Sequence, residues 1–406
     1  MGRWRIAIGV AVAVWIVLMV RLMIADVWDE TNGLLFFADP THTFGDLVTF
    51  TLTKSLGFWR PIPTLIAATV MHILPFDVSW RVLRGVNMVL LLGAVFFLIR
   101  TVDAWTGSNP ARSFVLTIAL LFSGSAVITA GWYANIFDAT SLFLIALALF
   151  LMTRRQFVLA GIAIGAGFFC KETTALALAF LVPLVATRRV RLRDAAVVAI
   201  PAVALGLAYF VLRGRIIAFG STGDVHGFDV QQYVPSALGF LESFWRETLK
   251  AGKPTVLGFC AMLFSLAALR KPVVIAAAVV FLAACTIIYW GMFAQYQDGL
   301  LVSHHDFAGR LYLVPVSLMI TLLALERRTL ALAILLVLIV SGGITTYRDH
   351  ARFQRAYRRI YRIAKPVTIY FPEKPLHDPA RGIEIGDLPN ATFTLDARTG
   401  RLLPRR

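Results

Sequence analysis

Three carboxylates stand close together just after the first apolar run of the chain. Residues 6–20 carry no charge, and the stretch "ADVWDET" soon after them contains Asp26, Asp29 and Glu30. Adjacent carboxylates at a membrane interface repel each other and are poorly solvated, which raises one pKa towards the range of a general base. The alternative is that these acids only mark an exported loop, but acidic residues contribute little to membrane orientation. We therefore predict a catalytic base in this segment.

Two arginines are candidate ligands for a phosphate group. The stretch "GFWRPIP" places Arg60 directly before a proline, and "SHHDFAGRLYLVP" places Arg310 at the start of a late apolar run. A guanidinium pairs with phosphate oxygens through a bidentate fork, which fits this function. The alternative is that each arginine only reaches from an apolar segment to the lipid head groups.

Other polar residues interrupt or border apolar runs. Lys171 and Glu172 of "CKET" lie between two such runs, where an ionisable group costs about 2.5–3.5 kcal/mol at the centre of a span. We expect this pair to line a wet cavity, either deep in one bent unit or in a turn at the rim. The adjacent His304 and His305 lack the spacing of a zinc site. Asn135 either lines the site or caps the helix that follows it.

The composition describes the scaffold that must position these residues. Of the 406 residues, 58% are hydrophobic and 15% are charged, and the mean hydropathy is +0.75. Soluble domains have about 45–50% apolar and about 25% charged residues, so this chain is a polytopic membrane protein. The net charge of +16 does not indicate nucleic-acid binding. Most arginines stand in short clusters between apolar runs, where they orient spans and contact anionic lipids.

The cysteines and the N-terminus are interpreted as parts of this scaffold. Cys170, Cys260 and Cys285 lie in or beside apolar runs and form neither a disulfide framework nor a metal-binding pattern. Arg3 and Arg5 precede a long apolar run that has no small-residue cleavage site after it. We expect this run to be a retained membrane anchor.

Apolar runs of the length of a membrane helix recur along the chain. We predict about eleven spans, which are 6–25, 81–99, 113–130, 138–152, 156–170, 173–187, 195–212, 254–269, 273–290, 310–325 and 329–345. The segment 61–74 is short and rich in proline, and counting it as a span would export the basic clusters of every later loop. It is predicted to be an interfacial helix in the first external loop, 26–80.

This topology collects the polar candidates on one external side. The basic clusters at 154–155, 188–193, 270–271 and 327–328 then share the inner side with the N-terminus. We predict a transmembrane catalytic domain over 1–345 and a short basic tail over 346–406 that lies outside. Chemistry is expected on the external side, where the loops are long enough to build a site.

The order of these motifs resembles the type C glycosyltransferase superfamily, whose members are integral-membrane enzymes that use polyprenyl-phosphate sugars. The closest resemblance is to the O-mannosyltransferase branch that carries tetratricopeptide repeats. "VWDE" is similar to the acidic pair of that branch, "FWRPIPTL" to its Arg-Pro motif, "CKET" to its Lys-Glu motif and "RLYLVP" to the start of a late span. The resemblance covers about residues 1–345. Asn135 stands where an arginine is usual, and the repeat domain has no counterpart.

The resemblance implies an all-α membrane bundle that acts as an inverting glycosyltransferase. Asp29 would be the general base, and Glu30 would orient the acceptor or Asp29. Arg60 and Arg310 would hold the donor phosphate, with Lys171 as a third cation. The predicted substrate-binding residues are Asp26, Asn135, Asp138, Glu172, His304, His305 and Asp306.

The resemblance also implies the partners of the reaction. The donor would be undecaprenyl phosphate or another polyprenyl phosphate carrying a sugar, and the acceptor a hydroxyl of a glycolipid, an envelope glycan or a protein. Because a monophosphate leaving group carries less charge than a diphosphate, no obligate metal is expected. The alternative is Mg²⁺ or Mn²⁺ held by Asp29 and Glu30.

Three other functions stay open at this point. They are a lipid-linked oligosaccharide ligase or polymerase, a transporter of lipid-linked sugars, and a non-catalytic scaffold. A transporter predicts inverted repeats and broken spans that meet near the midplane, whereas the polar groups here gather at one surface. The composition, rich in alanine and arginine, favours a bacterial inner membrane with the site facing the periplasm.

Overall fold

The structure is a computed structural model of the whole chain. The residues that it describes are 2–22, 43–53, 59–74, 76–132, 135–217, 255–293, 312–360, 367–370, 376–378, 383–386, 388–396 and 401–404. The predicted site residues Asp26, Asp29, Glu30, His304, His305, Asp306 and Arg310 lie outside these ranges.

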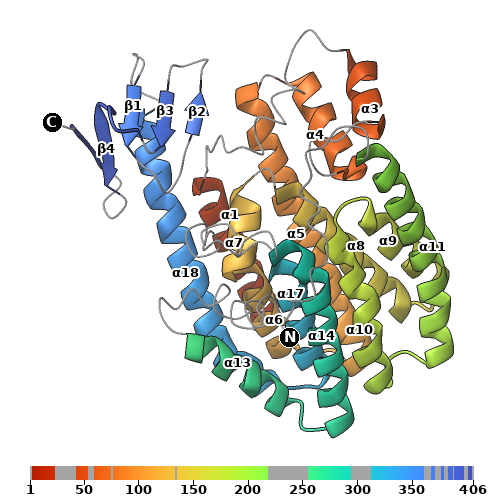
Figure 1. Ribbon diagram of the computed structural model, residues 1–406. Helices are drawn as coiled ribbons and strands as arrows, with labels where there is room; N and C mark the ends of the chain where they lie inside the picture. Colours follow the sequence, from red (N-terminus) through yellow and green to blue (C-terminus); the bar gives the residue numbers. More distant parts are fainter. Residues whose placement is uncertain are drawn as a thin grey trace.

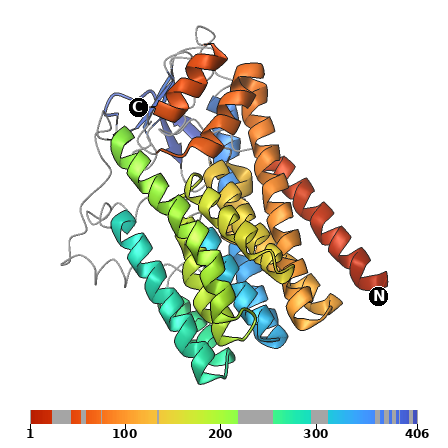
Figure 2. The same ribbon diagram turned by 90° about the vertical axis from the view of Figure 1, so that its right-hand side faces the viewer.

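Long apolar helices run side by side through the molecule and form a bundle (Figures 1 and 2). The helices are α1 (Gly2–Arg21), α3 (Phe44–Thr53), α4 (Pro61–Ile73), α5 (Phe76–Thr106), α6 (Pro110–Leu121), α7 (Gly124–Gly131), α8 (Ile136–Thr153), α9 (Phe157–Phe168), η3 (Glu172–Thr174), α10 (Ala175–Ala186), α11 (Leu192–Ile217), α13 (Thr255–Ala268), α14 (Pro272–Phe293), α17 (Leu313–Leu325) and α18 (Thr329–Ile360). The predicted all-α polytopic membrane protein is confirmed.

Several predicted spans correspond to helices that are too short to cross a membrane as a single helix. Within the described ranges, 5 helices meet the requirements of length and apolarity, and up to 6 do so if the bent pair of α6 and α7 is one span. The five are α1, α5, α8, α11 and α18. All of the predicted spans overlap helices, but several of these helices, such as α9 and α17, are shorter than a full span. Sequence hydropathy marked the helices correctly without giving their lengths.

Helix α17 occupies the centre of the bundle. All 13 of its residues are buried, and it contacts α5, α6, α8, α10 and α18. A helix that is apolar all round belongs in the interior, which agrees with this position. Beside it, α6 and α7 meet at a bend of 57°. Gly343 of α18 packs against this bend so closely that a Cβ there would lie 1.9 Å from the carbonyl oxygen of Phe122.

Four helix-to-helix turns each place an arginine in the left-handed region. These arginines are Arg155, Arg188, Arg270 and Arg327, with φ angles of 58°, 57°, 61° and 58°. At the end of α8 the amide of Arg155 donates to the Met152 carbonyl and the amide of Gln156 to the Leu151 carbonyl, each at 3.0 Å. This is the Schellman pattern, which satisfies the last carbonyls of a helix.

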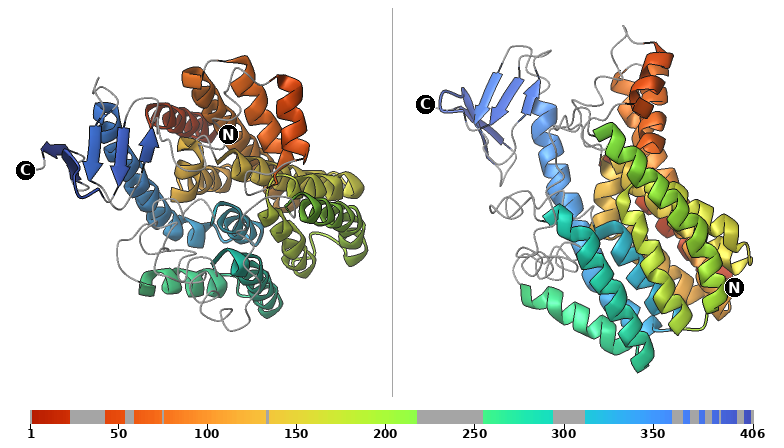
Figure 3. Two further views of the ribbon diagram at one scale, coloured as in Figure 1. Left: turned by 45° about the horizontal axis from the view of Figure 1, so that its top comes forward. Right: turned by 45° about the vertical axis from the view of Figure 1, so that its right-hand side comes forward.

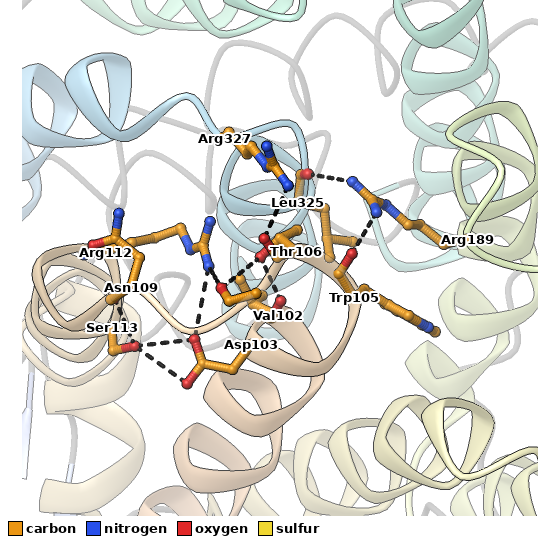
Figure 4. A network of polar contacts seen from close by, with 11 residues as sticks. Val102, Asp103, Trp105, Thr106, Asn109, Arg112, Ser113, Arg189, Leu325 and Arg327 are labelled. Carbon is orange, nitrogen blue, oxygen red and sulfur yellow. Dashed lines mark hydrogen bonds and ion pairs between the residues drawn. The ribbon is translucent and has the colours of Figure 1, made fainter.

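The basic turns gather at one end of the bundle. Figure 4 shows Arg189 and Arg327 reaching across to neighbouring turns, where Arg189 donates to the Leu325 carbonyl at 2.9 Å and Arg327 to the Thr106 carbonyl at 3.0 Å. Lys271 pairs with Glu326 at 2.9 Å. We call this end, which carries the turns after α5, α8, α10, α13 and α17, the basic end. The structure thus brings the predicted inner clusters together.

The segment predicted as an interfacial helix is α4, at the opposite end of the bundle (Figure 1). It begins with a proline, which is preorganised for the first helical turn. It packs on α3, α5 and α8. Its contacts form a second apolar cluster of buried residues, which are Leu47, Ala67, Ala68, Met71, Leu83, Trp132 and Ile136.

The C-terminal part, predicted only as a short basic tail, contains the end of a long helix and a small sheet. Helix α18 continues beyond residue 345 to Ile360 and is followed by a small sheet in the order β2-β3-β1-β4-β5. Its strands are β1 (Val367–Tyr370), β2 (Leu376–Asp378), β3 (Ile383–Gly386), β4 (Phe393–Asp396) and β5 (Arg401–Pro404). β1 is parallel to β3 and β4, and the outer pairs are antiparallel. Figure 3 shows the sheet beyond the end of α18, at the end of the molecule that carries α3 and α4.

Candidate active site

The "CKET" motif forms a tight turn between α9 and α10. The amides of Cys170 and Lys171 both donate to the Gly167 carbonyl at 2.9 Å, which ends α9. Lys171 is extended, with φ −166° and ψ 141°, and Glu172 then opens the single turn η3. Because neighbouring side chains of an extended segment point to opposite sides, Lys171 and Glu172 reach different partners.

Glu172 is the centre of a cluster of charged groups that come from three distant parts of the chain. Its Oε2 lies 3.0 Å from Nη2 of Arg60, and its Oε1 lies 2.8 Å from Nη1 of Arg213. The hydroxyl of Tyr209 donates to Oε1 at 2.8 Å. The side chains of Arg60, Arg213 and Glu172 are 10%, 18% and 21% exposed, so the cluster is not fully enclosed by protein. We call these four residues the Glu172 cluster.

The "FWRP" motif contacts Tyr209 of the Glu172 cluster through the backbone and the aromatic ring of Trp59. The Tyr209 hydroxyl lies 3.1 Å from the Trp59 carbonyl, and the two rings stack with centroids 5.7 Å apart. The amide of Ile62 donates to the Phe169 carbonyl at 3.4 Å, which joins the start of α4 to the α9–α10 turn. Arg60 also lies over the ring of Phe137 at 5.3 Å from its centroid. These contacts hold the Arg60 guanidinium in one place.

The charges of the Glu172 cluster keep its carboxylate ionised. Burial alone would raise the pKa of Glu172, but the guanidinium groups of Arg60 and Arg213 lower that pKa to about 2. Burial would likewise lower the pKa of Arg60, and the Glu172 carboxylate beside it raises that pKa above its ordinary value. Such a carboxylate is too weak a base for acceptor activation near neutral pH. Two guanidinium charges against one carboxylate leave the cluster with a net positive charge, which suits an anionic ligand.

Lys171 and Asp138 form a second, buried ion pair beside the "CKET" turn. Nζ of Lys171 lies 2.6 Å from Oδ1 of Asp138, and each side chain is 4% exposed. Asp138 stands in the first turn of α8, where the helix dipole favours a negative charge. Asn135 precedes the same helix, but its side chain does not cap it and instead donates to the Ile128 carbonyl at 3.3 Å. The pair fixes the "CKET" turn against the start of α8.

We predict that Glu172→Gln slows the enzymatic turnover by about 10- to 100-fold without moving the acid limb of the pH profile. The loss follows from weaker positioning of two arginines, since hydrogen bonds to charged groups contribute about 1.5–3 kcal/mol. The limb stays in place because the folded-state pKa of Glu172, about 2, lies below the ordinary value of 4.5. The carboxylate is therefore already ionised wherever activity is measured above about pH 4. A limb that shifts in the variant would identify Glu172 as a titrating catalytic group.

The structure brings together part of the predicted site. Arg60 and Glu172 are in direct contact, and Lys171 is joined to Asp138. Tyr209 and Arg213 were not predicted. The signal for Arg213 was available, because an arginine follows the predicted span 195–212 on the side that should be poor in basic residues. Tyr209 had no such signal, since it lies within an apolar helix.

Metal ligands are scarce in the described part of the chain. Among these residues, no group of three or more His, Cys, Asp or Glu side chains is placed to hold a metal ion. Asp29 and Glu30, the predicted alternative metal ligands, lie outside the described ranges. The metal-free reaction therefore stays a prediction.

The comparison with protein families identifies the chain. Residues 58–284 match the model of glycosyltransferase family 87, and this range is more than half of the 406 residues. The chain belongs to glycosyltransferase family 87. No curated protein and no solved structure matches it.

The matched range of this family 87 glycosyltransferase contains the whole Glu172 cluster and the Lys171–Asp138 pair. It begins with the first residue of "FWRP" and ends within α14. The predicted glycosyltransferase activity is thus confirmed at the level of the family, and the O-mannosyltransferase branch stays a prediction. The acidic pair of "VWDE" precedes the matched range.

Proposed function

We propose that the protein is an inverting glycosyltransferase of the type C superfamily that moves a sugar from a polyprenyl phosphate to a hydroxyl acceptor. The observation that carries this proposal is the Glu172 cluster, which holds two guanidinium groups with a net positive charge at one end of a membrane bundle. A lipid phosphate has its tail in the bilayer and its charge at such an end. Guanidinium groups bind a phosphate of this kind through paired hydrogen bonds.

In the proposed reaction, Asp29 accepts the proton of the acceptor hydroxyl. The acceptor oxygen forms a bond to the anomeric carbon on the face opposite the leaving group, and the bond from that carbon to the phosphate oxygen breaks. Polyprenyl phosphate leaves with the bonding electron pair, and the sugar inverts its configuration. Glu30 orients the acceptor or Asp29. Arg60, Arg213 and Arg310 stabilise the charge that develops on the phosphate.

Lys171 has a different place in this proposal from that of the arginines. Its ammonium group is already paired with Asp138 at 2.6 Å. We propose that it supports the turn that carries Glu172, and acts on the donor phosphate at longer range. The residues Asp26, Asn135, His304, His305 and Asp306 stay as proposed contacts of the sugar or the acceptor.

We predict that Arg213→Ala raises the donor concentration needed for half-maximal rate by about tenfold or more, since a charge-assisted hydrogen bond contributes about 1.5–3 kcal/mol. Arg60→Ala should have a similar effect. The matched control is Arg215→Ala, two residues further along α11, whose exposed side chain lies outside the Glu172 cluster. The measurement is release of polyprenyl phosphate by purified protein over a series of donor concentrations. If the donor concentration for half-maximal rate were the same in Arg60→Ala, Arg213→Ala and the control Arg215→Ala, Arg60 and Arg213 would not bind the donor phosphate.

We predict that chelation of divalent metals leaves the transfer rate unchanged within about twofold, because arginines neutralise a monophosphate leaving group without a metal. The measurement is the rate of purified protein before and after dialysis against EDTA. A rate that falls on chelation and returns with Mn²⁺ or Mg²⁺ would contradict the metal-free reaction. It would favour the acidic pair as the metal ligand.

We further propose that the site faces the exterior, in a bacterial inner membrane. The support is the division of charge between the two ends of the molecule. The basic end carries the four arginine turns described above, and such turns face the cytoplasm in most membrane proteins. The proposed acceptor is therefore a glycolipid, an envelope glycan or a protein outside the cytoplasm.

A further inference from the structure

A cavity of about 340 Å³ opens at the basic end, between the last turns of α5 and α8. Its walls include Arg100, Asp103, Phe150 and Arg154. It is distinct from the candidate active site, because Asp138 belongs to the first turn of α8 and Arg154 follows the last. At 1.5 Å per residue, the two positions are about 24 Å apart along the helix axis.

The charge of this cavity is positive. Arg100 and Arg154 are both exposed, and within the described ranges neither forms an ion pair with a carboxylate. Asp103 also lines the cavity, but Arg112 lies 3.7 Å from its carboxylate and the Ser113 hydroxyl donates to it at 3.3 Å. Figure 4 shows these partners of Asp103. Its charge is thus largely compensated, while the two guanidinium charges remain available.

The position of one guanidinium is fixed by an aromatic ring. Arg154 lies over the ring of Phe150, 5.3 Å from its centroid. A cation held over an aromatic face keeps its edge free for hydrogen bonds. Ser108 and Thr153 also line the cavity, and the Thr153 hydroxyl donates to the Phe150 carbonyl at 2.7 Å, which leaves its oxygen as an acceptor for a head-group hydroxyl.

An apolar stripe runs from the cavity along α5. Phe96 is 57% exposed and Val89 is 68% exposed, and both are large apolar side chains. Val89, Phe96 and Arg100 are spaced by seven and four residues, so they share one face of the helix. This stripe points from the basic end towards the middle of the bundle. A fatty acyl chain can follow it while the head group stays at the arginines.

We propose that this cavity binds the head group of an anionic phospholipid of the leaflet at the basic end. Arg100 and Arg154 contact the phosphate, and an acyl chain lies along Phe96 and Val89. Zwitterionic lipids fit less well, because their ammonium group needs a carboxylate and Asp103 is already paired. The site is independent of the proposed catalytic function, since it shares no residue with the Glu172 cluster.

The test is native mass spectrometry of the full-length protein, purified in detergent, delipidated and titrated with phosphatidylglycerol or with phosphatidylcholine of the same chain length. We expect preferential binding of one phosphatidylglycerol. The double variant Arg100→Ala/Arg154→Ala should weaken this binding by about 30-fold, because each basic residue near the head groups contributes about fivefold. The matched control is Arg191→Ala/Arg193→Ala, which removes two exposed charges of the basic end outside the cavity. It should weaken binding by less than about threefold.

Three results would overturn the proposal. Equal loss in both double variants would mean that only the total charge of the basic end matters. Equal binding of the two lipids would exclude a site selective for anionic head groups. Displacement of phosphatidylglycerol by millimolar inorganic phosphate would show a site for a free anion without a role for the acyl chain. Gel filtration of both variants checks that each is folded, which exposed substitutions should preserve.

Discussion

Asp29→Asn is expected to reduce glycosyl transfer by a factor of about 10²–10⁴, because a positioned general base contributes about this much to a rate. The amide has nearly the shape of the carboxylate but cannot accept the acceptor proton. Expression and binding of the polyprenyl-phosphate sugar should stay unchanged, since donor binding is assigned to the arginines. The measurement is single-turnover formation of polyprenyl phosphate by purified protein with saturating donor and acceptor.

The matched control for this variant is Asp46→Asn. Asp46 is an exposed carboxylate of α3 that accepts hydrogen bonds from Thr43, at the same end of the bundle as the Glu172 cluster. Its neutralisation should change the rate by less than about twofold, since surface substitutions away from a site have small effects. Turnover of Asp29→Asn at the rate of the control would remove Asp29 as the base.

The second large effect is expected on stability, from the buried pair of Lys171 and Asp138. Asp138→Asn removes the carboxylate that pairs with the Lys171 ammonium, at a position where each side chain is 4% exposed. Removal of one partner of a buried ion pair destabilises proteins by about 3–5 kcal/mol. Asp138→Asn should therefore lower the free energy of unfolding by about this amount. Thermal or denaturant unfolding of the detergent-purified protein measures it.

Two further variants separate the charge effect from a loss of packing. In Asp138→Asn/Lys171→Met neither charge remains, so much of the lost stability should return. Asp194→Asn is the matched single control, because Asp194 is also an acidic residue in the first turn of a helix, but it is only partly buried. It should cost about 0.3–1 kcal/mol. A double variant as unstable as Asp138→Asn would contradict the assignment of the loss to the broken ion pair.

The sequence predicted the scaffold of this protein better than the contacts of its site. Hydropathy marks the helices because each must satisfy its backbone hydrogen bonds within an apolar surrounding. The basic residues of the turns predicted that these turns lie at one end of the bundle. The contacts of Arg189 and Arg327 with neighbouring turns agree with this prediction. The lengths of α9 and α17 could not be predicted, since hydropathy alone does not show where a buried helix ends.

The contacts of the Glu172 cluster depend on how helices rotate and pack. Arg60 and Glu172 are 112 residues apart in the chain, and their motifs suggested a shared site but no direct bond. Tyr209 lies in a helix whose apolar residues do not mark one face strongly, so its direction could not be predicted. The partner of Lys171 was equally hidden, because a lysine beside a glutamate suggests that the two pair with each other. The extended backbone of Lys171 separates them instead.

The C-terminal sheet escaped prediction for a different reason. Its strands have only 3 or 4 residues each. They are interrupted by proline, glycine and arginine, so that no window shows a sustained alternation of apolar and polar residues. Pairing between strands distant in sequence, such as β1 with β3 and β4, is not visible in a local pattern.

The most direct test of the proposed function is mass spectrometry of lipid extracts and envelope glycans from cells that carry either the natural protein or Asp29→Asn. We predict that the variant cells accumulate a polyprenyl phosphate that carries one sugar, together with a glycan or glycolipid that lacks that sugar. This result would establish the transfer and name the donor and the acceptor together. Identical lipids and glycans in both strains, with the variant protein present at its normal level, would contradict a glycosyl transfer that depends on Asp29.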